Sequence, residues 1–186
     1  MMTVKEFKEG MDGTNCFLAV NSNTKETLII DPGDEAGKLS AYISKNQLQP
    51  AAVLLTHGHF DHCMAAGNLA EQYGISVYVH EDEKAVMENP AYNCCGMIGR
   101  ELVFTADKYF HGKTDHLSAA GFEIDVFHTP GHTPGGVCFY VKSDGILFSG
   151  DTLFNESVGR TDFPKGSMSQ LVRGIKEVLF QLPDDT

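Results

Sequence analysis

A chain of 186 residues with 42% hydrophobic and 21% charged side chains is long enough for one domain with a substantial core. Its formal net charge of −11 disfavours nucleic acid and anionic lipid as partners, so we expect a small-molecule substrate. The apolar runs are too short to cross a bilayer, and the N-terminus lacks the apolar block of a secretory signal, so a cytoplasmic location is the default expectation. The oligomeric state is left open.

Apolar runs separated by turn residues predict alternating strands and helices in the first half of the chain. Residues 16–20 and 27–31 are expected to form a hairpin, and residues 35–46 an amphipathic helix. The wholly apolar residues 51–55 predict a strand buried on both faces, and residues 62–73 predict a helix directly after it.

The middle of the chain is less regular. A strand at 75–79 and a short helix at 82–88 precede residues 89–115, which show no clear period and are expected to form a functional loop. The adjacent Cys94 and Cys95 fall in this loop, and we interpret them as ordinary small residues because an odd total of five cysteines does not suggest a disulfide framework. Three apolar runs then predict further strands, at residues 122–127, 137–141 and 146–148.

The clearest predicted helix lies at the end of the chain. Ser167 and Gln170 fit a capping box, and an apolar stripe runs from Met168 to Leu182. No repeat, linker or low-complexity tract interrupts residues 1–186, so we predict a single α/β domain.

A histidine-rich segment, THGHFDH at residues 56–62, follows the predicted buried strand. Because side chains alternate along a strand end, His57 and His59 can point to one side, with Asp61 and His62 next at the turn. Imidazole and carboxylate groups suit zinc, iron and manganese, so this segment predicts a metal site. We also expect the positive end of the following helix to lower the pKa of these histidines and keep them able to ligate.

Two later segments have the same character. HTPGHTPGG at residues 128–136 follows a strand, is rich in turn formers and offers His132. FSGDT at residues 148–152 ends another strand with Asp151. Each is a weak signal alone, and its value comes from joining the first motif.

Together, THGHFDH, TPGHTPGG and SGDTLF, in this order and separation, resemble the metallo-β-lactamase superfamily. Within it, SVGRTDFPKGSMSQL followed by LPDDT is similar to short bacterial glyoxalase II-like (hydroxyacylglutathione hydrolase-like) hydrolases. The resemblance covers residues 31–186 and implies a four-layer αβ/βα sandwich with its site at one sheet edge.

The resemblance also implies a site for one or two ions, zinc first, with iron or manganese as alternatives. The positions that match metal ligands are His57, His59 and His132 for the first ion, Asp61 and His62 for the second, and Asp151 between them. Asp31 matches a strand-end carboxylate that supports the metal loop without ligating, and we place Thr56 in the same supporting role.

One departure concerns the second ion. The family normally supplies a further histidine from a Pro-Gly-His-Gly segment shortly after the position of Thr186. By that comparison we expect the chain to be short at its C-terminus, without that ligand and a closing strand. The second site would then hold its ion weakly or be empty.

The expected chemistry is hydrolysis. A metal-bound water has its pKa lowered towards neutrality, and the resulting hydroxide, oriented by Asp61, would attack a carbonyl carbon whose oxyanion the metals stabilise. A thiolate leaves readily, so a thioester is a sensible substrate, and the resemblance points to S-lactoylglutathione-type thioesters.

Two of the remaining polar candidates have two possible roles each. Arg160 either pairs with a substrate carboxylate or forms an ion pair with Asp162. His128 either supports the metal site or is a buried structural histidine. The other histidines are expected to be solvated: His80, His111 and His116.

Two other functions stay open. One is a persulfide dioxygenase-like oxidoreductase with a single iron, held by His57, His59 and either Asp151 or His132. The other is a non-catalytic metal-binding protein. The net charge disfavours nucleic-acid processing, and the missing secretory signal disfavours a β-lactamase.

Overall fold

The computed structural model describes residues 1–10 and 13–186, which build two β-sheets packed face to face. In the first sheet, six strands lie in chain order; β1 to β3 are antiparallel and β3 to β6 are parallel. Its strands are β1 (Met2–Glu9), β2 (Thr14–Asn21), β3 (Glu26–Ile30), β4 (Gln49–Leu54), β5 (Ser76–His80) and β6 (Lys108–Phe110). The predicted hairpin and buried strand are confirmed as β2, β3 and β4.

The second sheet has four antiparallel strands in the order β10-β9-β8-β7. They are β7 (Thr114–Ala119), β8 (Phe122–His128), β9 (Val137–Val141) and β10 (Ile146–Phe148). A small hairpin of β11 (Leu153–Phe154) and β12 (Ser157–Val158) follows, and the sequence did not predict it.

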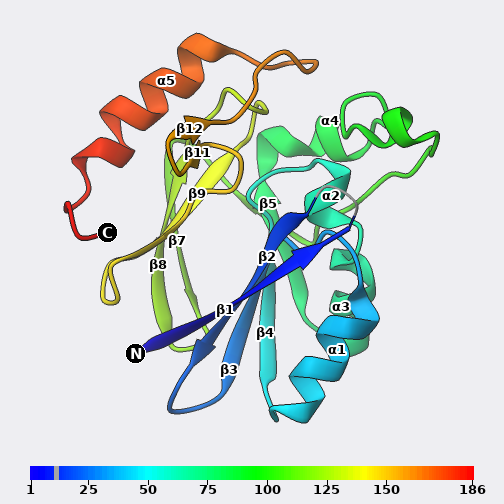
Figure 1. Cartoon of the computed structure of the whole chain (residues 1–186), viewed down its shortest axis with the longest axis vertical. Helices are drawn as coiled ribbons and strands as arrows, with labels where there is room; N and C mark the ends of the chain where they lie inside the picture. Colours follow the sequence, from blue (N-terminus) through cyan, green and yellow to red (C-terminus); the bar gives the residue numbers. More distant parts are fainter. Residues whose placement is uncertain (11–12) are drawn as a thin grey trace.

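Helices cover the outer face of each sheet, which makes four layers (Figure 1). Leu39 and Ile43 of α1 (Ala36–Lys45) and Leu69 of α3 (Ala66–Tyr73) pack on the first sheet. On the other side, α5 (Met168–Glu177) packs its buried face against the second sheet. The main core between the sheets is apolar on both sides, and the predicted four-layer sandwich is confirmed.

The helix predicted over residues 62–73 is wrong in one respect, because it is two helices. A single turn, α2 (Phe60–Cys63), precedes α3. The amide of Ala65 donates to the carbonyl of Pro32 at 3.0 Å, and Gly33 lies so close to the carbonyl of Asp61 that a Cβ there would be 1.7 Å from the oxygen. The loop after β3 thus occupies the groups that would continue the helix.

Residues 89–115 are more ordered than predicted. They contain β6, the start of β7 and a turn of 3-10 helix at Cys95–Ile98. Both strands are weak sequence signals: β6 has three residues, and β7 alternates only between exposed and half-buried side chains. The predicted helix at 82–88 appears as a 3-10 turn (Glu81–Glu83) followed by α4 (Lys84–Met87).

The final helix is confirmed as α5, with a further 3-10 turn at Leu179–Gln181. The hydroxyl of Ser167 accepts the amide of Gln170, as the capping box predicts. Met168, assigned to the apolar stripe, is instead half exposed. Among the helices of the described residues, none has the length and apolarity that crossing a membrane requires.

Candidate metal centre

The histidine loop begins where β4 ends, beside the end of β3. The parallel register pairs Ile30 with Leu54, so Asp31 comes to lie against Thr56. Asp31 accepts the backbone amide and the hydroxyl of Thr56, both at 2.7 Å. These bonds fix the first residue of the loop, and the role of Asp31 and Thr56 in supporting a metal site stays a prediction.

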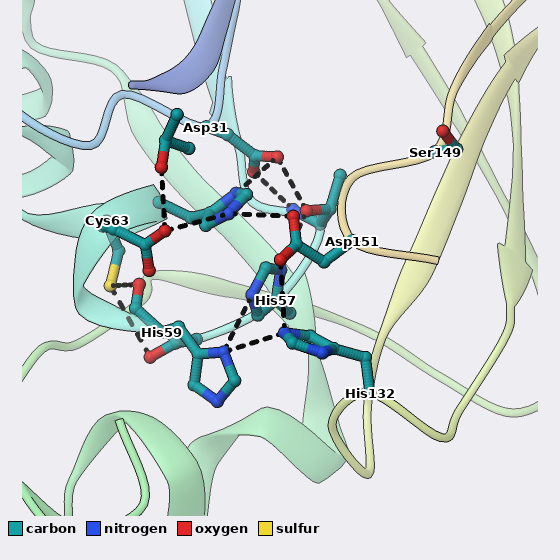
Figure 2. Close-up of polar contacts among 12 residues, drawn as sticks. Asp31, His57, His59, Cys63, His132, Ser149 and Asp151 are labelled. Atoms are coloured by element: carbon teal, nitrogen blue, oxygen red, sulfur yellow. Dashed lines mark hydrogen bonds and ion pairs between the residues drawn. The ribbon is translucent and has the colours of Figure 1, made fainter. Parts of the chain in front are cut away.

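Three imidazoles converge at this end of the sheets (Figure 2). Nδ1 of His59 lies 3.1 Å from Nε2 of His57 and 3.0 Å from Nε2 of His132. The rings meet edge to face, at angles of 85–86°. The first two come from the loop after β4 and the third from the loop after β8, so residues far apart in sequence share one point.

Hydrogen bonds on the outer nitrogens set the tautomers. Because the Thr56 hydroxyl donates to Asp31, it must accept from Nδ1–H of His57, which is 3.1 Å away. Nδ1–H of His132 donates to the carbonyl of Arg160 at 2.7 Å. Both Nε2 atoms therefore present lone pairs to the shared point, as metal ligands do.

A second cluster of donor atoms adjoins the first. Nε2 of His62 lies 3.5 Å from Oδ2 of Asp61 and 3.3 Å from Oδ1 of Asp151. The other oxygen of Asp151 is 3.5 Å from Nε2 of His132, and Figure 2 shows the two side chains facing each other. The Asp151 carboxylate therefore lies between the two clusters. Nδ1 of His62 faces Oδ2 of Asp31 at 3.1 Å. The structure thus brings together all six residues predicted as ligands.

The charges of the cluster follow from burial and from the carboxylates. Burial lowers the pKa of His57 well below its ordinary value and that of His59 to about 3, with help from neighbouring imidazoles. Burial also lowers the pKa of His62, but Asp31 and Asp151 outweigh it and raise this pKa well above its ordinary value. The predicted lowering is therefore wrong for His62, and for the other two the cause is burial rather than a helix end.

Asp151 is held in its charged form. Burial opposes its ionisation, but the hydrogen bond and charge of His62 and the charges of His132 and His59 lower its pKa to about 2. An ionised carboxylate between His62 and the three converging imidazoles is suited to binding cations.

The donor set fits a divalent transition metal. A tetrahedral ion with metal–nitrogen distances of about 2.0–2.1 Å keeps its ligand nitrogens about 3.3 Å apart, close to the spacing found here. The three imidazoles are almost fully buried, and the nitrogen of His59 that faces the other two rings is Nδ1. Three buried imidazole nitrogens that meet at one point, with a carboxylate beside them, are the kind of donor set that binds a transition-metal ion.

Two cavities reach the clusters. One, of about 350 Å³, opens on His59, His132 and Asp151 and is bounded by Phe163 and Cys94. The other, of about 470 Å³, opens on the side of His62 and Asp61. Burial raises the pKa of the Cys94 thiol to about 11, so the thiol is protonated there, in keeping with its interpretation as an ordinary loop residue.

Arg160 lies at the edge of the first cavity but is already paired. Its guanidinium makes two 2.7 Å hydrogen bonds to the carboxylate of Asp162 and lies over the ring of Phe163 at 4.1 Å. Of the two readings of Arg160, the ion pair is the one present, and contact with a substrate stays a prediction.

The other histidines correct one expectation. His80 was predicted to be solvated but is buried, because its Nε2 contacts the carbonyl of Gly112 and its ring stacks on that of His128 at 4.0 Å. Nε2 of His128 donates to the carbonyl of Pro134, in the loop that carries His132. His128 therefore contacts the backbone of the His132 loop and none of the proposed metal ligands directly. His111 and His116 are exposed, as predicted.

A residue of the site that the sequence did not reveal is Thr14, whose hydroxyl donates to Oδ2 of Asp61 at 2.8 Å. It lies at the start of β2, 47 positions from its partner, and a lone threonine at a strand end carries no signal. Its hydrogen bond orients the Asp61 carboxylate, and both residues line the larger of the two cavities.

Comparison with known proteins agrees with this geometry. Residues 10–186 match the family model of the metallo-beta-lactamase superfamily. The chain is 40% identical to the probable metallo-hydrolase YqgX of Bacillus subtilis, over 87% of this chain and 77% of that protein. It is 36% identical to the hydroxyacylglutathione hydrolase GloC of Haemophilus influenzae, over 92% and 81%.

Among solved structures, the BLEG-1 B3 metallo-beta-lactamase superposes with a TM-score of 0.91 at 37% identity, over 97% of this chain and 87% of that one. The match to the family model extends over both histidine loops and the Asp151 strand end. The four layers, the shared point of the imidazoles and these similarities agree, and the chain belongs to the metallo-beta-lactamase superfamily.

Proposed function

We propose that this chain is a metal-dependent hydrolase of thioesters of the S-lactoylglutathione type. The observation that carries the proposal is the convergence of the inward nitrogens of His57, His59 and His132, with Asp151 between them and His62. Similarity to a hydroxyacylglutathione hydrolase and to a probable metallo-hydrolase supports hydrolysis, and thioester specificity is the finer part of the proposal.

The chain's own residues have distinct roles in this reaction. A divalent metal bound here would supply Lewis acidity towards a carbonyl oxygen and acidify water. Asp61, oriented by Thr14, borders both cavities and can accept a hydrogen bond from the attacking water, which aims the water at the carbonyl carbon. His57 is kept neutral by burial and Nδ1–H of His132 donates to the Arg160 carbonyl, so both residues can offer Nε2 to the ion.

The test is hydrolysis of S-lactoylglutathione by purified protein, with and without a chelator. We expect activity to fall below detection with chelator and to return with added zinc, iron(II) or manganese, each tried separately. A His59→Ala variant should lose both activity and metal content, while His116→Ala, an exposed histidine on β7, should keep both. Equal rates for all these samples would end the proposal.

The alternative functions give different results in the same experiment. A persulfide dioxygenase-like enzyme would consume oxygen with glutathione persulfide and depend on iron alone. A β-lactamase would hydrolyse a chromogenic β-lactam faster than the thioester. A non-catalytic protein would bind metal tightly and turn over none of the three substrates.

A further inference from the structure

Glu83 is a fully buried carboxylate that contacts both histidine loops. It ends the 3-10 turn after β5 and has no exposed surface. Its Oε2 accepts the backbone amide of Gly58 at 2.7 Å, and its Oε1 accepts that of Gly135 at 2.6 Å. Gly58 lies between His57 and His59, and Gly135 lies three residues after His132.

The backbones of Gly58 and Gly135 pack so closely against the Glu83 turn that neither position has room for a side chain. A Cβ at Gly58 would lie 2.9 Å from Oε2 of Glu83 and 2.6 Å from Cγ of Met87. A Cβ at Gly135 would lie 2.7 Å from the amide nitrogen of Glu83. Both loops therefore approach the Glu83 turn as closely as backbone atoms can, which a side chain at either position would prevent.

A carboxylate is a costly group to bury for packing alone. No Lys or Arg of the described residues lies within ion-pair distance of Glu83, so its charge is balanced only by hydrogen bonds. Its chemistry explains the choice: an ionised carboxylate accepts at both oxygens, whereas a glutamine of the same size accepts at one and turns an N–H₂ group towards the other amide.

We propose that Glu83 is a positioning residue that sets the spacing between the His57–His59 loop and the His132 loop, and thereby the affinity for metal. It reaches no proposed ligand directly and acts through the peptide groups next to them. The inference rests on the metal site of the proposed function, and it adds a residue that neither the motifs nor the family comparison assigns.

The test measures metal affinity rather than turnover. Zinc binding to Glu83→Gln is compared with the unsubstituted chain by competition with a chromophoric chelator, and the absorption spectrum of the cobalt(II)-loaded protein reports the ligand geometry. Loss of a residue that orients metal ligands typically weakens binding 10- to 100-fold, and we expect a decrease of about this size with a changed spectrum.

Two controls separate positioning from loss of stability. Glu81→Gln makes the same change on the same turn, at an exposed residue paired with His111, and should alter neither readout. Leu39→Ala removes core packing from α1 on the far side of the first sheet and should lower the thermal midpoint without changing zinc affinity or the cobalt spectrum.

The outcomes are distinct. Unchanged affinity and spectrum in Glu83→Gln overturn the inference, as does an equal loss of affinity in Leu39→Ala. If Glu83→Gln does not fold, Glu83→Asp, which keeps the charge but reaches only one loop, should fold and bind zinc more weakly. Failure of both to fold would make Glu83 a requirement of the fold and overturn the role. If the unsubstituted chain binds no metal, the proposed function itself fails.

Discussion

Asp31 holds Thr56 by two hydrogen bonds of 2.7 Å, one to its amide and one to its hydroxyl. The hydroxyl in turn accepts from His57, so a single side chain links the carboxylate to the tautomer of a proposed ligand. All three residues of this hydrogen-bonded series, Asp31, Thr56 and His57, are buried. Hydrogen bonds to a charged group are strong in a buried environment and costly to lose.

Replacing Thr56 by valine should weaken both the fold and the metal site. Thr56→Val keeps the size and the amide but leaves Nδ1–H of His57 without a partner and leaves Oδ2 of Asp31 with His62 alone. We expect the free energy of unfolding to fall by about 2 kcal/mol and zinc affinity to fall roughly 10-fold or more, measured by urea denaturation and chelator competition.

A matched control exists for this change. Thr27 is also fully buried, and its hydroxyl donates to the carbonyl of Lys25, at the opposite end of β3. Thr27→Val should cost about 1 kcal/mol and leave zinc affinity unchanged. If Thr27→Val weakens zinc binding as much as Thr56→Val, the effect of Thr56 is one of general stability.

The carboxylate of Asp151 should decide how many ions the chain holds. Asp151→Asn removes the negative charge between the two clusters while keeping the shape of the side chain. We expect elemental analysis to show fewer metal ions per chain, and thioester hydrolysis to fall by about 100-fold or more. Asp125→Asn, in the middle of β8 beside His116, is the control and should change neither. Full metal content and activity in Asp151→Asn would contradict the assigned place of this residue.

Much of the site could be predicted because its ligands lie at the ends of predictable strands. A wholly apolar run identified β4, and the register of β4 with β3 then brings Asp31 to the motif. Motif residues that follow such strands converge because the carboxyl ends of parallel strands share one edge of the sheet.

Residues buried by long-range contacts were not predictable. Glu83 bonds to glycines 25 and 52 positions away, and nothing in Glu81-Asp82-Glu83 marks the third acid as the buried one. His80 was misjudged for the same reason: the charged residues that follow it suggested solvent, while the stacking partner His128 comes from the other sheet. Sequence neighbours report on local structure, and burial is decided by the packing of the two sheets.

The close approach of Gly33 to Asp61 should make this glycine irreplaceable. A methyl group at Gly33 would lie 1.7 Å from the Asp61 carbonyl oxygen, so Gly33→Ala must push away the loop that carries His57, His59, Asp61 and His62. We expect a loss of about 3 kcal/mol in the free energy of unfolding, together with weaker zinc binding. Gly37→Ala, at an open position in α1, should instead stabilise the chain by about 0.5–1 kcal/mol. Similar stabilities for the two variants would show that the Gly33 contact relaxes freely.

Glu9 should make stability depend on pH. It ends β1 with 2% of its surface exposed, and burial raises its pKa from 4.5 to about 7, although its carboxylate accepts the amide of Asp34. Between these two values the folded chain keeps a proton that the unfolded chain releases, so the free energy of unfolding falls as pH rises from 4.5 to about 7 and levels off above. At about 1.4 kcal/mol per pKa unit, the fall is on the order of 3 kcal/mol.

The variant Glu9→Gln removes this titration. Relative to the unsubstituted chain, its free energy of unfolding should therefore be higher at about pH 8 than at about pH 5. Denaturation at both pH values, with chelator present so that metal binding does not contribute, measures the difference. Glu6→Gln, an exposed glutamate of the same strand paired with Lys8, should leave the pH dependence as it was. An identical pH dependence in Glu9→Gln and the unsubstituted chain would mean that Glu9 ionises in the folded state as easily as in water, and that its burial at the end of β1 carries no cost.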